Sequence, residues 1–226
     1  NGGHTTIVES YEGIEAAVIT LNDGVVDLTS FDDGINGSSG SGSQSMSSES
    51  GVLVTINGGT LVMDASGDGL DSNGSLVMND GTVIVFGPTN NGNGAIDYNG
   101  TFELKGGTLL AVGSSGMAEQ ASTSTQNTVL INFSGVAAGE TVSIIDESGN
   151  IIVSVVAPKT FSSIVYSGTN LVNGDYILVS GGTTDATYTN NVSTMGNISS
   201  YTSIGTFSIS QTITSFGSQS AQPGGT

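Results

Sequence analysis

Acidic and amide side chains recur in this sequence on either side of a short Gly–aliphatic or Ala–aliphatic pair. A side chain that recurs at one place in a repeated β-structure stacks on its equivalents at the strand spacing of about 4.8 Å. The glycine inside the copies suits a tight corner with a positive φ. We therefore predict an acidic ladder, with one column of Glu15, Asn36, Asp71 and Asp97, a neighbouring column of Glu12, Asp33 and Asp68, and Asp32 beside it.

The chemistry that suits such a ladder is the binding of a hard cation. Two carboxylates about 5 Å apart repel by about 1–3 kcal/mol at an effective dielectric of about 20 to 80. Few basic residues could relieve this repulsion, because the chain has only Lys105, Lys159 and one His. Ca²⁺ takes about six to eight oxygen ligands from carboxylates and carbonyl groups. We predict Ca²⁺ on the ladder, although the G-G-x-G-x-D calcium repeat is absent; the alternative is a solvated acidic face with raised pKa values.

Composition excludes several classes of function. The 226 residues carry a formal net charge of −18, with no Arg, no Cys and no Trp. Nucleic-acid binding is excluded because affinity there comes from Lys and Arg on phosphates. Disulfides are excluded, and no apolar run approaches the ~18 residues of a membrane span. The acidic surface, rich in Ser, Thr, Asn and Gly and without a signal peptide, predicts a processed extracellular or cell-surface chain.

The ladder residues belong to a repeat of 21–26 residues, measured from Ile14 to Ile35 and from Leu70 to Ile96. A Ser- and Gly-rich insertion at 37–50 lengthens one copy and indicates a loop. Apolar residues alternate in short bursts between Gly and Asn, which predicts short strands joined by tight turns. About three strands per repeat, without a helical pattern, predict an all-β fold in which the chain forms a parallel β-helix.

In such a β-helix, aliphatic residues stack inside successive turns of the chain, which we call coils. Four such columns are expected to form the core of residues 1–126. They are Ile14, Ile35, Leu70 and Ile96; Leu21, Ile56, Met78 and Leu104; Val26, Leu61, Val83 and Leu109; and Ile7, Leu28, Met63, Val85 and Ala111.

From about residue 127 the pattern changes to longer strands. Residues 141–145 and 151–156 flank the turn 146–150 and predict a β-hairpin. Further strands are expected at 128–133, 162–166, 176–179 and 205–213. An open end of a β-helix exposes unpaired strand edges, so we expect 127–226 to be a continuing β-region that caps the C-terminal end of the coils.

The chain resembles a known family. The resemblance is carried by the acidic repeats described above and by three further strings, Thr55-Ile-Asn-Gly-Gly-Thr60, Gly113-Ser-Ser-Gly-Met-Ala118 and Ile213-Thr-Ser-Phe-Gly217. This is the polysaccharide-lyase-like, carbohydrate-binding β-helix family of cellulose-degrading anaerobes. The resemblance covers almost the whole chain. It implies a right-handed, single-stranded parallel β-helix, bound calcium, an extracellular location, and binding of cellulose and of acidic sugars such as polygalacturonate.

Three function classes follow. The first is a non-catalytic, calcium-dependent polysaccharide binder, and the second is a surface protein that assembles into filaments. The third is a pectate-lyase-like enzyme, which would need a strong base near the acids. Lys105 is expected at another corner, Lys159 in the cap, and His4 at the surface, so we expect no catalysis. Aromatic stacking on cellulose is also expected to be weak, because only Tyr11 and Tyr98 are obvious outward candidates.

The filament hypothesis comes from the ends of the chain. Asn1-Gly2-Gly3 aligns with Asn57-Gly58-Gly59, which lies inside a coil. The chain is therefore expected to begin in mid-coil and to leave an open strand edge. The C-terminal region or the tail 221–226 of a second copy could cover that edge, which would give a head-to-tail homopolymer through the β-helix ends.

Overall fold

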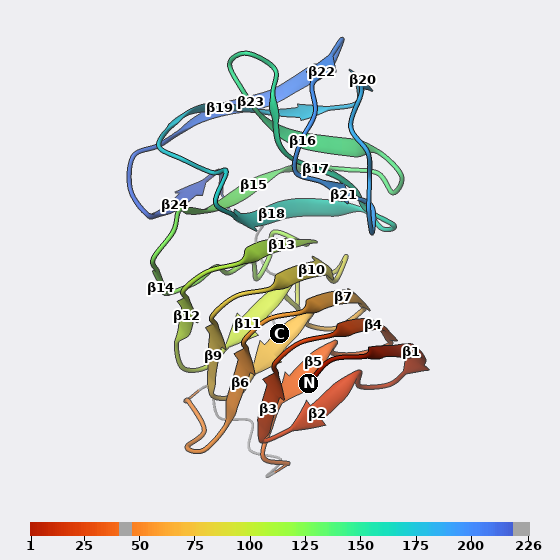
Figure 1. Cartoon of the computed structure of the whole chain (residues 1–226), viewed down its shortest axis with the longest axis vertical. Helices are drawn as coiled ribbons and strands as arrows, with labels where there is room; N and C mark the ends of the chain where they lie inside the picture. The colour runs from red at the N-terminus through yellow and green to blue at the C-terminus, as the bar shows by residue number, and fades with distance from the viewer. Residues whose placement is uncertain (41–46, 219–226) are drawn as a thin grey trace, which may run out of the picture.

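The structure is a computed structural model that describes residues 1–40 and 47–218 (Figure 1). The described residues form strands and connecting loops, with no helix among them, so no helix of this part is long and apolar enough to cross a membrane.

Five sheets account for the 24 strands of the described residues. Sheet 1 contains, in order, β1 (His4–Ser10), β4 (Val25–Ser30), β7 (Thr60–Ala65), β10 (Thr82–Phe86), β13 (Thr108–Gly113), β18 (Phe161–Ser167), β15 (Thr128–Val136) and β24 (Ile213–Phe216). Sheet 2 contains β11 (Ile96–Tyr98), β8 (Leu70–Ser72), β5 (Ile35–Gly37) and β2 (Ile14–Ala16). Sheet 3 contains β14 (Thr123–Ser124), β12 (Phe102–Leu104), β9 (Ser75–Met78), β6 (Leu53–Ile56) and β3 (Val18–Leu21).

The other two sheets belong to the C-terminal part of the chain. Sheet 4 contains β21 (Val192–Ser193), β17 (Ile151–Val156), β16 (Thr141–Asp146), β19 (Gly174–Ser180) and β23 (Thr202–Ile209). A small fifth sheet pairs β20 (Thr183–Thr184) with β22 (Ile198–Ser199).

Up to β12 the chain visits sheets 1, 2 and 3 in strict rotation, and neighbouring coils pair parallel in all three sheets. The register confirms the four predicted aliphatic columns; for example, Ile14 pairs with Ile35, Ile35 with Leu70, and Leu70 with Ile96. These side chains form one continuous apolar core in which Met63, Val85 and Ile96 are fully buried. The prediction of an all-β fold with parallel sheets is therefore confirmed.

An asparagine ladder lies at the corner that leads from sheet 3 to sheet 1. Asn22 donates to Asn1 at 2.7 Å, Asn57 to Asn22 at 2.8 Å, and Asn79 to Asn57 at 2.7 Å, in each case from Nδ2 to Oδ1. The glycines that follow these residues, such as Gly59 at φ 80° and Gly81 at φ 100°, have left-handed backbone that suits glycine. The recurring Asn-x-Gly pattern thus builds the tight turn of each coil.

Replacing the middle rung of this ladder should destabilise the coils. Asn57→Ala removes two side-chain hydrogen bonds, at a cost of about 1–2 kcal/mol, which corresponds to a fall of about 2–8 °C in melting temperature. Asn1→Ala is the control, since it removes only the terminal rung and should cost about half as much. Equal melting temperatures for Asn57→Ala and the unaltered chain would show that the ladder contributes nothing.

The C-terminal region extends sheet 1 across the last coil. β18 pairs antiparallel with β13, β15 pairs antiparallel with β18, and β24 pairs parallel with β15. The predicted hairpin is confirmed as β16 and β17. The predicted single strand at 205–213 is wrong, because β23 pairs with β19 in sheet 4 whereas β24 pairs with β15 in sheet 1. The chain crosses from one sheet to the other at 210–212.

Sheet 4 packs on the outer face of sheet 1 and forms a second apolar core. Ile84 and Leu110 on that outer face contact the cluster that includes Ile144, Val153 and Leu178. β10 and β13 are therefore buried on both faces, whereas β7 alternates between buried and half-buried residues. The coils below and this sandwich above share one sheet (Figure 1).

The predicted insertion at 37–50 begins one residue later than expected, because Gly37 ends β5 and pairs with Ser72. Glu49 accepts hydrogen bonds from the backbone and the hydroxyl of Ser39, at 3.3 and 2.7 Å, near the base of the loop. Residues 41–46 of this insertion, and the tail 221–226 considered for the filament contact, lie outside the described residues.

Candidate metal centre

The first column of the acidic ladder lies on sheet 2. Glu15 pairs with Asn36, Asn36 with Asp71, and Asp71 with Asp97, each at the centre of its three-residue strand. Because alternate residues of a strand point to opposite faces, the flanking aliphatic residues enter the core and this column faces outward. The stacking predicted from the spacing is confirmed.

The second column lies in the loops that lead into sheet 2. The backbone N–H of Gly13 donates to the carbonyl of Asp33 at 2.9 Å, and that of Gly34 to the carbonyl of Asp68 at 2.9 Å, so the loops of successive coils stack. The side chains take part as well. Asp33 Oδ1 accepts the N–H of Asp68 at 2.7 Å, and Asp68 Oδ1 accepts the N–H of Gly94 at 2.6 Å.

The glycines of these loops have a different role from the predicted one. Gly13, Gly34 and Gly69 are not among the residues with positive φ, so the expected left-handed corner is wrong. They are needed for close approach, because a Cβ on Gly34 would lie 2.5 Å from the carbonyl oxygen of Gly69 and one on Gly69 would lie 2.6 Å from that of Ala95. Glycine thus allows the loops to stack at hydrogen-bonding distance.

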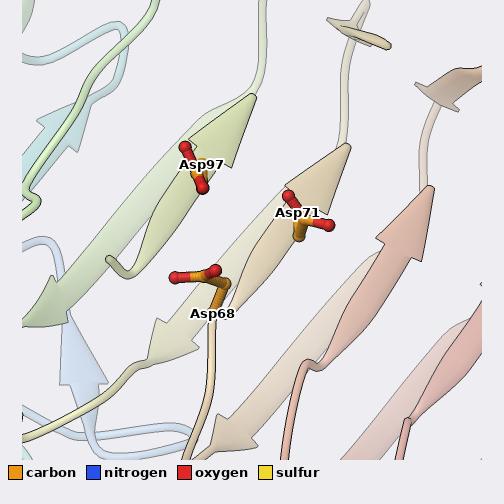
Figure 2. Close-up of side chains that lie close together, drawn as sticks. All are labelled: Asp68, Asp71 and Asp97. Carbon is orange, nitrogen blue, oxygen red and sulfur yellow. The ribbon is translucent and has the colours of Figure 1, made fainter. Parts of the chain in front are cut away.

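Three carboxylates of the ladder converge into what we call the acidic triad. Asp71 and Asp97 extend from adjacent strands, β8 and β11, and Asp68 approaches from the loop before β8 (Figure 2). One carboxylate oxygen of each lies within 4.8 Å of those of the other two. Oxygens bound to Ca²⁺ at 2.3–2.6 Å lie at most about 5 Å apart. The spacing of the three carboxylates is therefore close to the one that a single bridging ion requires.

The other predicted ligands lie along the same corner, at different depths. Asp33 interacts electrostatically with Asp68 and Asp71. Glu12 Oε2 and Asn36 Oδ1 are buried oxygens that have no hydrogen-bond donor among the described residues. Buried polar atoms are seldom left without a partner. These two acceptors, like the carboxylates of the triad, are the oxygen ligands that a hard cation prefers, so the residues present fit Ca²⁺.

Glu15 lies away from the triad, whereas the charge of Asp32 acts on Asp68. Glu15 is exposed on the first coil; burial, followed by the charges of Asp32 and Glu15, raises the pKa of Glu12. Asp32 accepts a hydrogen bond from the exposed Tyr11. Among the eight predicted ligands, the structure thus brings Asp68, Asp71 and Asp97 together, with Asp32, Asp33, Glu12 and Asn36 on the coils beside them.

Burial and mutual repulsion make the ladder costly in its charged form. Burial, followed by the charges of Asp33, Asp68 and Asp97, raises the pKa of Asp71 to about 8. Burial and Asp68 raise the pKa of Asp33 to about 7. Burial raises the pKa of Asp68 to about 6 against the opposing hydrogen bond from Gly94, and burial also raises the pKa of Asp97. Near neutral pH Asp33, Asp68 and Asp71 are therefore partly protonated in the folded chain, and a bound cation would stabilise their charged forms.

Glu119 joins the cluster and was not predicted. Burial, followed by the charges of Asp97 and Asp68, raises its pKa to about 7. Its neighbour Gln120 accepts a hydrogen bond from Tyr98, 22 residues earlier, at 2.9 Å. That separation matches the repeat, and the electrostatic interaction of Glu119 with Asp97 agrees with it. The signal in the sequence was Ala118, an apolar residue that follows Ile96 by the same 22 residues; the structure shows that it is buried.

The basic residues are paired elsewhere. Lys105 forms an ion pair with Glu103 at 2.9 Å, and Lys159 forms one with Asp64 at 2.7 Å. His4 lies at the surface of sheet 1, with Nε2 2.6 Å from Asp27. None of the three is among the causes of the shifted pKa values of the triad. Tyr98, expected to face outward, is half-buried and packs edge-on against Phe102.

Comparisons with models of protein families, with curated proteins and with solved structures found no match.

Proposed function

We propose that this chain is a non-catalytic, calcium-dependent polysaccharide-binding protein of the cell surface or extracellular space. The observation that carries the proposal is the acidic triad, whose three carboxylates lie within reach of one ion. The buried acceptors on Glu12 and Asn36 support it, since they need a donor or a cation. The strict rotation of strands between three sheets supports the further proposal of a right-handed parallel β-helix.

The choice of ligand rests on charge and on the family resemblance. A surface of net charge −18 repels an anionic polymer unless cations lie between them. A calcium ion held by one oxygen of each triad carboxylate keeps open coordination positions, because these three oxygens are fewer than its usual six to eight. The carboxylate of a uronate sugar is a suitable ligand for those positions. Acidic polysaccharides such as polygalacturonate are therefore the first candidates.

Lyase or hydrolase activity is not part of the proposal. Proton abstraction next to a uronate carboxylate needs a base that is within hydrogen-bonding reach of the bound sugar. Lys105 and Lys159 form ion pairs with acids outside the ladder, at Glu103 and Asp64. The carboxylates of the triad serve better as metal ligands than as bases while they share an ion.

Binding to polygalacturonate should require a divalent cation. In millimolar calcium we expect retention on a polygalacturonate column, and in excess chelator the chain should elute with the void volume. Asp71→Asn should weaken binding at least tenfold, since it removes a charged ligand from the site. Glu140→Gln, which removes one charge from an exposed position before β16, is the matched control and should bind normally. Undiminished binding in chelator would overturn the calcium-bridged mode.

A further inference from the structure

A groove separates the outer face of sheet 1 from the segment between β20 and β22. It encloses about 710 Å³, which lies within the usual range of about 300–1,000 Å³ for small-molecule sites. Ile84 and Leu110 lie on the sheet side, and Val192 and Met195 on the opposite wall. The groove is on a different sheet from the acidic triad, because its sheet side is formed by β7, β10 and β13 of sheet 1.

Three threonines form a row along one side of this groove. Thr60, Thr82 and Thr108 begin β7, β10 and β13 and pair in register, so their hydroxyls recur at about 4.8 Å. In the described part of the chain, no hydrogen bond engages these three hydroxyls. The same position holds Val25 in β4 and His4 in β1, so the row is confined to the strands that the groove covers.

The opposite wall is held in place by the backbone of sheet 4. The N–H of Val156 donates to the carbonyl of Asn191 at 2.9 Å, and the N–H of Ile151 donates to the carbonyl of Gly196 at 2.8 Å. The groove is therefore formed before any ligand arrives, which lowers the entropic cost of binding.

The charge of the groove selects an uncharged occupant. Asp185 is the charged side chain among the described residues that line it, and its Oδ1 already accepts the N–H of Asn197 at 2.6 Å. The lining includes no Lys, so nothing attracts an anion. The remaining polar groups are the hydroxyls of Thr and Ser and the amide of Asn190, beside apolar side chains. Hydroxyl groups next to C–H surfaces are the complement of a neutral sugar.

We propose that this groove binds a neutral oligosaccharide, with the hydroxyls of Thr60, Thr82 and Thr108 as its hydrogen-bonding row. The inference extends the proposed carbohydrate-binding function to a second site that needs no metal. The lining has no aromatic ring for stacking, so we expect a Kd on the order of 1 mM.

The test is an NMR titration of the full chain with cellotetraose, xylotetraose and maltotetraose in excess chelator. We expect saturable shifts for at least one of them, centred on Thr82, Thr108 and Val192. The near-isosteric double variant Thr82→Val/Thr108→Val should weaken binding about tenfold, because it removes two hydrogen-bonding groups and keeps the shape. Thr20→Val, at an exposed position of β3, is the control and should bind as the unaltered chain does.

Two results would overturn the proposal. One is the absence of saturable shifts with all three sugars, and the other is binding that the double variant leaves unchanged. Neither result bears on the proposed calcium-dependent function, which is tested separately. The double variant should still bind polygalacturonate in calcium, and Asp71→Asn should still bind the neutral sugar in chelator.

Discussion

Calcium is expected to raise the melting temperature of this protein by about 5–11 °C. An ion that binds only the folded chain adds about 2.7 kcal/mol at a hundredfold excess over its Kd, and each kcal/mol shifts the melting temperature of a chain of this size by about 2–4 °C. The effect should be large here because the ion also relieves repulsion among Asp68, Asp71 and Asp97. Differential scanning calorimetry with and without chelator measures it.

Asp71→Asn separates this explanation from a general salt effect. Without metal the variant should be more stable than the unaltered chain, because it removes the charge that burial and three neighbouring acids disfavour most. With calcium its gain in melting temperature should be less than half as large. Glu140→Gln removes an exposed charge and should respond to calcium normally. A variant that is less stable in chelator and equally responsive to calcium would show that Asp71 has a purely structural role.

The second large effect is an inverted dependence of stability on pH. The raised pKa values of Asp33, Asp68, Asp71 and Glu119 mean that the folded chain binds more protons than the unfolded chain between about pH 4 and pH 8. The free energy of unfolding of the metal-free protein should therefore fall as pH rises through this window. Most of the loss should occur between about pH 5 and pH 8, and it should amount to several kcal/mol.

Denaturant unfolding at pH 5 and pH 8, in chelator and in calcium, tests this pH dependence. In calcium the free energy of unfolding should fall less steeply with pH, or rise with it, because protons and the ion compete for the same carboxylates. Asp71→Asn should reduce the slope in chelator. If the metal-free protein gained stability from pH 5 to pH 8, the carboxylates of the ladder could not be buried without a neutralising partner.

Much of the coil region could be predicted because each coil repeats the same physical problem. Aliphatic residues at one position of a repeat must stack, so Leu61, Val83 and Leu109 were enough to align three strands of sheet 1. The same alignment placed Asp71 beside Asp97. The position of Asp68 beside them could be predicted on the single further assumption that the loops stack as the strands do.

Other features depend on contacts that no local pattern encodes. The role of Gly34 is set by a carbonyl on the next coil, which becomes visible only when the loops are stacked. Glu119 lies where the repeat has decayed, in a segment that forms no strand of sheet 2. The packing of sheet 4 on Ile84 and Leu110 brings together residues more than 30 positions apart in the sequence. The only sign of this packing in the sequence is that the apolar runs of β10 and β13 are longer than those of β1, β4 and β7.

The central claim is that Asp68, Asp71 and Asp97 hold a divalent cation. A crystal structure of the full chain grown in calcium, with anomalous data collected to identify the ion, tests it most directly. We expect an ion with an oxygen of each of the three carboxylates at about 2.3–2.6 Å. A triad that contains only water in crystals with millimolar calcium, or an ion bound elsewhere while these side chains point apart, would contradict the claim.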